Sequence, residues 1–330
     1  MNLEHIYKKS LTHQILRNDI SYSMLHHAYM IVSTDKIKIN EYAKLMACEV
    51  FCANNNKPCL ECFECKKVLH GTHSDIAVYP DKERLTVEES RKIASDIFIA
   101  PFESKHKVYI IENFDNATLQ SQNALLKTLE EPTSFVIFIL LVNNENNVAT
   151  TIKSRVKTIT ERLIEKEDLI NIFSVKTNFK SEELQTLCVA SNGNLTVAKE
   201  YLENANISKI LSLVSDVFFE MKKSSDVLHH VERALKFKGD DMPTFLDQML
   251  ILINNYAIFL TNKDNIKDSD LTKYFIQNAS DYSPKVLEKI SKHINTAYKK
   301  LESHCGQTAI FDSLFMSILE EKFLYKNKNY

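Results

Sequence analysis

The first half of the chain alternates short apolar runs with helical segments, and this alternation limits the fold more than any other feature. The runs are rich in β-branched and aromatic residues and comprise Ala28–Ser33, Asp75–Tyr79, Lys107–Ile111 and Phe135–Val142, with Val156–Thr160 as a candidate fifth. Continuous rather than alternating hydrophobicity is typical of parallel strands that are covered on both faces. The sequence therefore predicts a doubly wound parallel α/β domain over residues 1–160.

Two of the intervening helices carry clear boundary signals. Thr86 and Glu89 have the spacing of a capping box, which predicts a helix that runs to Ile97 and stops before Pro101. A second helix is expected over residues 116–131, because leucines recur on one side of it and Pro132 disfavours helix in the residue before it.

After about Glu161 the pattern changes to helices only. A short helical lid domain is predicted over residues 161–205, with Gly193 as a turn between two helices, and a longer helical domain over residues 206–330. The longer domain contains three amphipathic stripes of the kind that usually form a core, namely Ile210/Leu211/Val214/Val217/Phe218/Met221, Phe245/Leu246/Met249/Leu250/Ile253/Tyr256 and Ile310/Phe311/Leu314/Phe315/Ile318/Leu319. The predicted fold class is α/β followed by all-α.

Composition narrows the functional classes. A chain of 330 residues suits two or three domains, and its net charge of -2 argues against a broadly basic surface, so that any DNA contact is expected to be local or shared with partners. The N-terminal residues lack a signal-peptide pattern, and no apolar run approaches the ~18 residues of a membrane helix. Seven cysteines, an odd number, favour reduced thiols and a cytoplasmic location.

Four of the cysteines are crowded together. Cys52, Cys59, Cys62 and Cys65 give the spacing C-x6-C-x2-C-x2-C. Two overlapping C-x2-C knuckles bring thiolates close enough to share one tetrahedral ion, and the earlier cysteine completes the set. The spacing predicts a structural Zn²⁺ within a module over residues 48–73, because four thiolates leave no open position for water. Cys48, one helical turn before Cys52, is an alternative first ligand; His70 and His73 are weaker alternatives.

Glycine is unusually scarce. Only Gly71, Gly193, Gly239 and Gly306 occur in the whole chain. The phosphate-binding loops G-x-x-x-x-G-K-[ST] and G-x-G-x-x-G need closely spaced glycines, so that backbone N–H groups can approach the phosphates. No pair of glycines here is close enough, and the sequence therefore predicts that the chain does not bind ATP in the usual way.

The segment 123–132 (NALLKTLEEP), Ser154-Arg155 after an apolar strand, and the four-cysteine insert together resemble bacterial clamp-loader subunits of the AAA+ class. The resemblance covers most of residues 1–205 in order and spacing, and within the DNA polymerase III clamp loader it points to an ATP-silent member. It implies an AAA+ type α/β domain, a helical lid and a C-terminal helical collar. It also implies gamma/tau and delta subunits as partners, with the sliding clamp and primed DNA reached through the complex, and a place in a nucleotidyltransferase holoenzyme.

Several positions of the family's ATP site are altered. Bulky residues fill 34–40 (TDKIKIN), where backbone should surround phosphate, although Lys36 and Lys38 remain as phosphate contacts or as exposed loop residues. Glu112-Asn113 replaces the Asp-Glu pair that holds Mg²⁺ and polarises water. Asn143 matches the sensor-1 position, whereas Thr196 stands where related ATPases often carry a sensor-2 arginine. Intrinsic ATP hydrolysis is not expected.

The resemblance also implies a role for Arg155. In the family a Ser-Arg-Cys motif presents its arginine to the γ-phosphate of ATP on a neighbouring subunit, and Ser154-Arg155-Val156 retains the first two residues. Arg155, preceded by Ser154, is therefore predicted to act as an arginine finger in trans; the alternative is an ordinary surface ion pair. An ATP-hydrolysing gamma/tau-like subunit and a zinc-dependent nucleic-acid-binding module remain as alternative functions.

Overall fold

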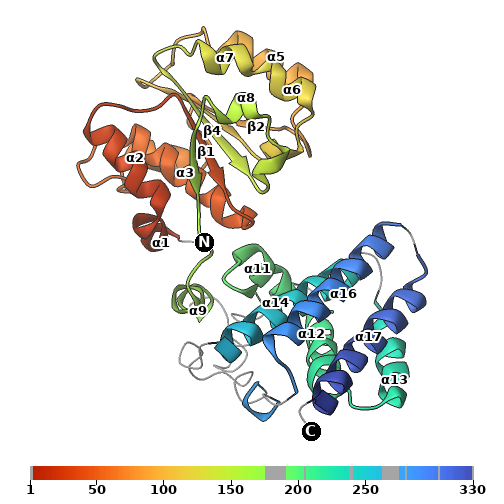
Figure 1. Cartoon of the computed structure of the whole chain (residues 1–330). Coiled ribbons are helices and arrows are strands. Elements are labelled where there is room, and N and C mark those ends of the chain that lie inside the picture. Colours follow the sequence, from red (N-terminus) through yellow and green to blue (C-terminus); the bar gives the residue numbers. More distant parts are fainter. Residues whose placement is uncertain are drawn as a thin grey trace. The chain divides into compact units, whose positions relative to one another are not determined.

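The computed structural model describes residues 3–174, 191–203, 206–237, 241–261, 275–278, 281–303 and 305–328. The chain divides into two compact units (Figure 1). The first, called the α/β unit, comprises Met1–Ile172 and Asn194–Thr196; the second, the helical unit, comprises Phe173–Gly193 and Val197–Tyr330. Among the described helices, none combines the length and the apolar character needed to cross a membrane.

The α/β unit contains a five-stranded parallel sheet in the order β2-β3-β4-β1-β5. Its strands are β1 (Ala28–Val32), β2 (Ile76–Tyr79), β3 (Lys107–Ile111), β4 (Val136–Val142) and β5 (Lys157–Thr160). Every residue of β1 and β4 is buried, as continuous hydrophobicity requires. All five predicted strands are confirmed to within one residue at each end.

Helices cover both faces of the sheet (Figure 1). One face carries α1 (Glu4–Lys9), α2 (Leu11–Ser21), α3 (Lys36–Phe51) and α4 (Phe63–Leu69), and the other carries α5 (Val87–Asp96), α6 (Leu119–Ala124), α7 (Leu126–Glu130) and α8 (Thr150–Lys153). Tyr29 and Ile31 of β1 belong to the first core, whereas Ala28 and Met30 belong to the second. This alternation confirms the doubly wound α/β prediction.

The helix boundaries agree with the sequence in one case and differ in another. The capping box at Thr86 and Glu89 is present at the start of α5. The single helix predicted over residues 116–131 is wrong: a short 3-10 helix (Phe114–Asn116) precedes α6, and a break at Leu125 separates α6 from α7. The Leu125 N–H donates to the Gln122 carbonyl, three residues back, at 3.1 Å. The tighter turn buries Leu125 and Leu129 while Leu119 stays 63% exposed.

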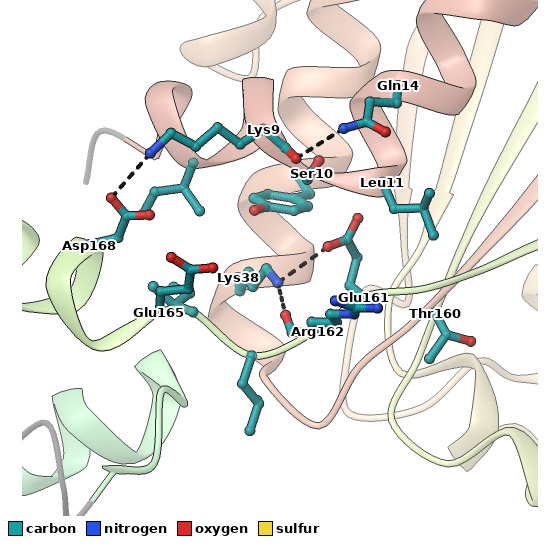
Figure 2. A pocket seen from close by; sticks show the side chains of 14 residues that line it. Lys9, Ser10, Leu11, Gln14, Lys38, Thr160, Glu161, Arg162, Glu165 and Asp168 are labelled. Carbon is teal, nitrogen blue, oxygen red and sulfur yellow. Dashed lines mark hydrogen bonds and ion pairs between the residues drawn. The ribbon is translucent and has the colours of Figure 1, made fainter. Parts of the chain in front are cut away.

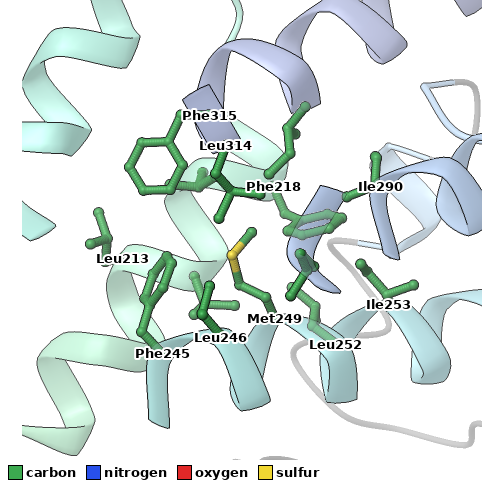
Figure 3. Close-up of a cluster of buried hydrophobic side chains, with 14 of the residues drawn as sticks. Leu213, Phe218, Phe245, Leu246, Met249, Leu252, Ile253, Ile290, Leu314 and Phe315 are labelled. Carbon is green, nitrogen blue, oxygen red and sulfur yellow. The ribbon is translucent and has the colours of Figure 1, made fainter. Parts of the chain in front are cut away.

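The helical unit is built around one apolar core (Figure 3). In the described part of the chain its core is built from α12 (Ile207–Ser215), a short π-helix (Asp216–Glu220), α13 (Ser224–Ala234), α14 (Asp241–Thr261), α16 (Pro284–Glu302) and α17 (Gln307–Lys328). Each of the three predicted stripes lies in this core or packs against it. The all-α prediction for the second half is therefore confirmed.

Two helices contain residues of both units, α9 (Lys166–Ser174) and α11 (Leu195–Glu203). Gly193 has a φ of +79°, which glycine adopts without steric cost, and α11 begins two residues later. The predicted turn before this helix is confirmed. Residues 175–190, which belong to the predicted lid domain, lie outside the described part of the chain.

Candidate functional site

The turn after β1 presents a buried carboxylate to two helix N-termini. Asp35 is the N-cap of α3 and accepts a hydrogen bond from the Lys38 N–H at 3.2 Å. The same carboxylate accepts from the Leu195 N–H at 2.6 Å, and from the N–H and hydroxyl of Thr196 at 3.2 and 3.0 Å. Unpaired N–H groups at a helix N-terminus are a natural anion site. Here the anion is the chain's own side chain.

Thr196 has a second role at this turn. Its hydroxyl accepts a hydrogen bond from the Ile37 N–H at 3.0 Å, so that residues 35–37 and 194–196 are joined in both directions. The sequence drew attention to Thr196 as the expected replacement for a sensor-2 arginine, and the structure places it against residues 35–37, in the turn after β1. The role of Asp35 was missed; an acidic residue directly before a helix was the available signal.

Lys38 is neither an exposed loop residue nor a free phosphate ligand, which corrects both expectations. It is 2% exposed, its Nζ lies 3.3 Å from Glu161 Oε2, and it donates to the carbonyl of Arg162 (Figure 2). Burial lowers the pKa of Lys38, and the charge of Glu161 opposes that shift. The other oxygen of Glu161 accepts from the N–H and hydroxyl of Thr12 at 2.7 and 2.6 Å.

A cavity of about 330 Å³ opens beside this ion pair, within the α/β unit. Figure 2 shows Lys38 beside Glu161, and Lys9 directed at Asp168. The distance from Lys9 Nζ to Asp168 Oδ1 is 3.6 Å. The lining thus carries charges of both signs, and two of its cations, Lys38 and Lys9, are paired with carboxylates of the same lining. An incoming anion would have to displace an internal carboxylate in order to reach Lys38.

The carboxyl ends of β3 and β4 are neighbours, and they bring Asn113 and Asn143 together. Asn143 Nδ2 donates to Asn113 Oδ1 at 3.3 Å. Asp115 accepts from the N–H groups of Asn143 and Asn144 at 3.2 and 3.1 Å. Burial raises the pKa of Glu112. Asn113 and Asn143 are thus a pair of hydrogen-bonded amides, and an amide does not accept a proton from water at neutral pH.

Arg155 follows the short helix α8 and is about one-third exposed. Its Nη1 donates to the carbonyl of Thr151 at 2.7 Å and to the Ser154 hydroxyl at 3.0 Å. Its Nη2 lies 2.6 Å from Glu130 Oε1, at the end of α7. The structure thus brings Ser154 and Arg155 into direct contact and shows an ion pair within the chain.

The four predicted cysteines form one cluster. The sulfurs of Cys52, Cys59, Cys62 and Cys65 all lie within 4.8 Å of one another, with Cys59 and Cys65 at 4.0 Å. The two knuckles direct backbone N–H groups at sulfur: Cys62 N–H to Cys59 Sγ at 3.4 Å, and Cys65 N–H to Cys62 Sγ at 3.5 Å. The N–H of Cys62 helps lower the pKa of Cys59 to about 6, whereas burial raises the pKa of Cys52 to about 12.

Cys48 lies beside the cluster but does not join it. Its thiol faces the carbonyl of Cys65 at 3.7 Å, and the Cys65 sulfur faces the carbonyl of Cys48 at 3.8 Å. His73 lies elsewhere, with Nε2 3.0 Å from Glu64 and Nδ1 accepting from the Asp75 N–H at 3.2 Å. Among the described residues, the cluster of four sulfurs therefore starts at Cys52.

Comparison with known proteins gives matches to subunits of DNA polymerase III. The family described as "DNA polymerase III, delta subunit" matches residues 8–164. The delta' subunit of DNA polymerase III from Bacillus subtilis is 25% identical over 331 residues, which cover 93% of this chain and 95% of that protein. The chain is therefore similar in sequence to clamp-loader subunits of DNA polymerase III.

Clamp-loader relatives of the gamma and tau type match over a shorter stretch. The gamma subunit from Buchnera aphidicola (subsp. Acyrthosiphon pisum) is 30% identical over 197 residues, 58% of this chain and 55% of that protein. The chain spans about half the length of the two Buchnera gamma subunits and of the tau subunit from Bacillus subtilis, where 49% is covered, and 22–33% of the other tau and gamma/tau relatives. A solved gamma subunit-related protein from Thermotoga maritima has a TM-score of 0.44 at 16% identity, covering 94% of this chain and 99% of that one.

Proposed function

We propose that this chain is a non-catalytic subunit of a DNA polymerase III clamp loader, which binds no ATP of its own and supplies Arg155 to ATP held by a neighbour. The similarity to a delta' subunit over nearly the whole chain supports the place in the complex. The observation that carries the non-catalytic role is the Asp35 carboxylate, which accepts hydrogen bonds at the start of both α3 and α11.

Asp35 opposes nucleotide binding through charge as well as space. A phosphate seated at the same N–H groups would lie within a few ångström of a buried carboxylate. Two like charges 4 Å apart repel by ~4 kcal/mol at an effective dielectric constant of ~20. A penalty of that size lowers an affinity by ~10³. Ile37 and Ile39, in place of glycine, further keep phosphate from the backbone.

The role proposed for Arg155 rests on its chemistry and placement. A guanidinium presents a rigid fork of donors that matches phosphate oxygens, and it stays charged at all physiological pH values. Arg155 is partly exposed at the end of a four-residue helix. From there the arginine would reach across a subunit interface, with Ser154 Oγ and the Thr151 carbonyl holding Nη1.

The partners follow from the relatives. We assign the gamma/tau and delta subunits as neighbours, and the sliding clamp and primed DNA as the substrates reached through the complex, in the cytoplasm with the replication machinery. Residues 1–160, 161–205 and 206–330 would serve as AAA+-like, lid and collar domains.

Phe98, Ile99 and Phe102 are 72%, 61% and 87% exposed, which gives the α/β unit an apolar surface of the kind that protein partners cover.

The cysteine cluster is proposed to hold a structural Zn²⁺. A tetrahedral site with Zn–S bonds of about 2.3 Å separates its sulfurs by about 3.8 Å. The sulfurs of Cys52, Cys59, Cys62 and Cys65 are within 4.8 Å of one another and thus fit with small adjustments. Four thiolates would complete the coordination shell, so that the ion would tie the end of α3 to the start of α4 and take no part in a reaction.

Assembly tests this function. When the purified chain is mixed with gamma/tau and delta subunits, we expect one complex in size-exclusion chromatography, because the helical collar has to complete the ring. The isolated chain should show no ATP hydrolysis in a steady-state assay, since the phosphate position is filled and the base is an amide. Hydrolysis by the isolated chain would instead indicate a gamma/tau-like subunit. Salt-sensitive DNA binding by the isolated chain, without assembly, would indicate a nucleic-acid-binding module.

A further inference from the structure

The two terminal nitrogens of Arg155 have different partners. Nη1 is held by the arginine's own helix, through the Thr151 carbonyl and the Ser154 hydroxyl. Nη2 faces Glu130, whose Oε1 lies 2.6 Å away. The side chains are 33% and 45% exposed, so this ion pair lies at the surface of the α/β unit. Arg155 is therefore oriented by its own backbone, and Glu130 is an additional partner.

Among the described residues, Arg155 is the ion-pair partner found for the Glu130 carboxylate. Glu130 is the last residue of α7, where the helix dipole disfavours negative charge. Its side chain is exposed and is not part of either core of the unit. Glu131, the next residue, is also exposed and, in the described part of the chain, no ion pair is found for it. Glu130 contacts Arg155 and its neighbour Glu131 does not, so Glu131 can serve as a control position.

We infer that Glu130 is a positioning residue, whose ion pair with Arg155 persists until a phosphate group displaces Glu130 from the guanidinium. We call this the parking role of Glu130. The inference rests on the proposed finger role of Arg155. Both hydrogens of Nη1 are directed at the Thr151 carbonyl and the Ser154 hydroxyl, so a bidentate contact with two phosphate oxygens would use Nη2 together with Nε. Glu130 occupies Nη2 and therefore blocks this contact. A carboxylate left in place would also repel the incoming phosphate. Arg155 must therefore exchange Glu130 for the γ-phosphate of ATP on the neighbouring subunit.

The ion pair between Glu130 and Arg155 is weak enough to be exchanged reversibly for another contact. Surface ion pairs of this exposure shift an equilibrium by only about two- to fivefold. When the competent state of a protein is populated only in part, the affinity for its partner falls by that fraction, while the fully bound state is unaffected. Glu130 should therefore affect the concentration of this chain that is needed to activate ATP hydrolysis by the neighbouring subunit. It should leave the maximal rate of hydrolysis unchanged.

A Glu130→Gln variant tests the inference in the assembled loader. The chain is titrated into gamma/tau and delta subunits with clamp, primed DNA and ATP, and the half-saturating concentration and maximal rate of hydrolysis are measured. We expect Glu130→Gln to lower the half-saturating concentration about two- to fivefold at an unchanged maximal rate. Glu131→Gln removes the same charge from the neighbouring position and should change neither quantity.

A double-mutant cycle separates the possible outcomes. In an Arg155→Ala background the effect of Glu130→Gln should vanish, because the two residues act through one contact. If Arg155→Ala lowers hydrolysis but Glu130→Gln changes nothing, the parking role is wrong and the finger role stands. A lower maximal rate with Glu130→Gln would also overturn it, because Glu130 would then hold the arginine in its working position. If Arg155→Ala has no effect, the finger role fails and the parking role with it.

Discussion

Replacing Arg155 by alanine is expected to lower ATP hydrolysis at the neighbouring site about 10³-fold, while the complex still assembles. An arginine finger neutralises charge that develops on the transferring phosphoryl group and typically contributes 10³–10⁵ in rate. The measurement is single-turnover hydrolysis by a reconstituted loader in which only the site beside this chain is competent. Arg155→Lys should recover a small part of the rate, because lysine keeps the charge and loses the planar fork.

Lys153→Ala provides the matched control for this experiment. Lys153 is a cation in the same short helix, and its Nζ donates to the carbonyl of Glu145 at 3.2 Å, away from Ser154 and Arg155. Its replacement should leave the single-turnover rate within about twofold, as for other surface charges. Equal rates for the wild-type and Arg155→Ala complexes would show that Arg155 is only the surface ion pair seen with Glu130.

Cys52→Ser is expected to abolish zinc binding, whereas Cys48→Ser should keep it. Cys52 belongs to the cluster of four sulfurs, while the thiol of Cys48 contacts a backbone carbonyl. A metal that binds only the folded chain stabilises it by ~2.7 kcal/mol at a concentration of 100 Kd. Its loss should lower the unfolding temperature of the chain by ~5 °C or more. Metal content by mass spectrometry and thermal unfolding by circular dichroism check both expectations.

The comparison of the two serine variants decides between the candidate first ligands. Both cysteines are buried near the end of α3, so a general packing defect would affect the two variants alike. Zinc retained in Cys52→Ser and lost in Cys48→Ser would show that the ligand set shifts by one helical turn. Zinc absent from the wild-type chain, purified without chelators, would contradict the site altogether.

The strands and the overall order of the fold were predictable from consecutive residues. A parallel strand covered on both faces needs an unbroken apolar run, and β1, β3 and β4 each have one. The break at Leu125 was not predictable, since leucine is a good helix former and carries no stop signal. The buried side chain of Gln122, three residues before the break, donates to the carbonyls of Ala117 and Asn147, and the second of these contacts is not evident from the sequence.

The chemical roles were predictable only where the partners are close in the sequence. The knuckles at Cys59, Cys62 and Cys65 are local, and their clustering is confirmed. Asp35 and Thr196 lie 161 residues apart, so their contact follows from the folded chain and not from a motif. The same holds for Lys38 and Glu161, which are 123 residues apart. Lys38 was a candidate exposed loop residue, but it is buried and forms an internal ion pair with Glu161.

Cys48 and Cys52 illustrate a finer limit. The two residues are four positions apart, and spacing alone allowed either of them to complete the cluster. Helix α3 ends at Phe51, and Cys52 has an extended backbone, with φ -64° and ψ 125°. The chain thus leaves the helix at Cys52, whose sulfur joins the knuckles, while Cys48 stays within the helix. The residue at which α3 ends therefore determines which cysteine joins the cluster. Helix ends are the part of a helix that sequence predicts least well.

Calorimetric titration of Mg²⁺–ATP into the isolated chain tests the central claim most directly, because that claim is that Asp35 fills the phosphate position. We expect no saturable heat up to about 1 mM ATP, which corresponds to binding weaker than about -4 kcal/mol. The gamma/tau partner, titrated in the same buffer, should bind. Saturable one-to-one binding by this chain at micromolar concentrations would contradict the account, because ATP would then occupy a position that the structure gives to a carboxylate.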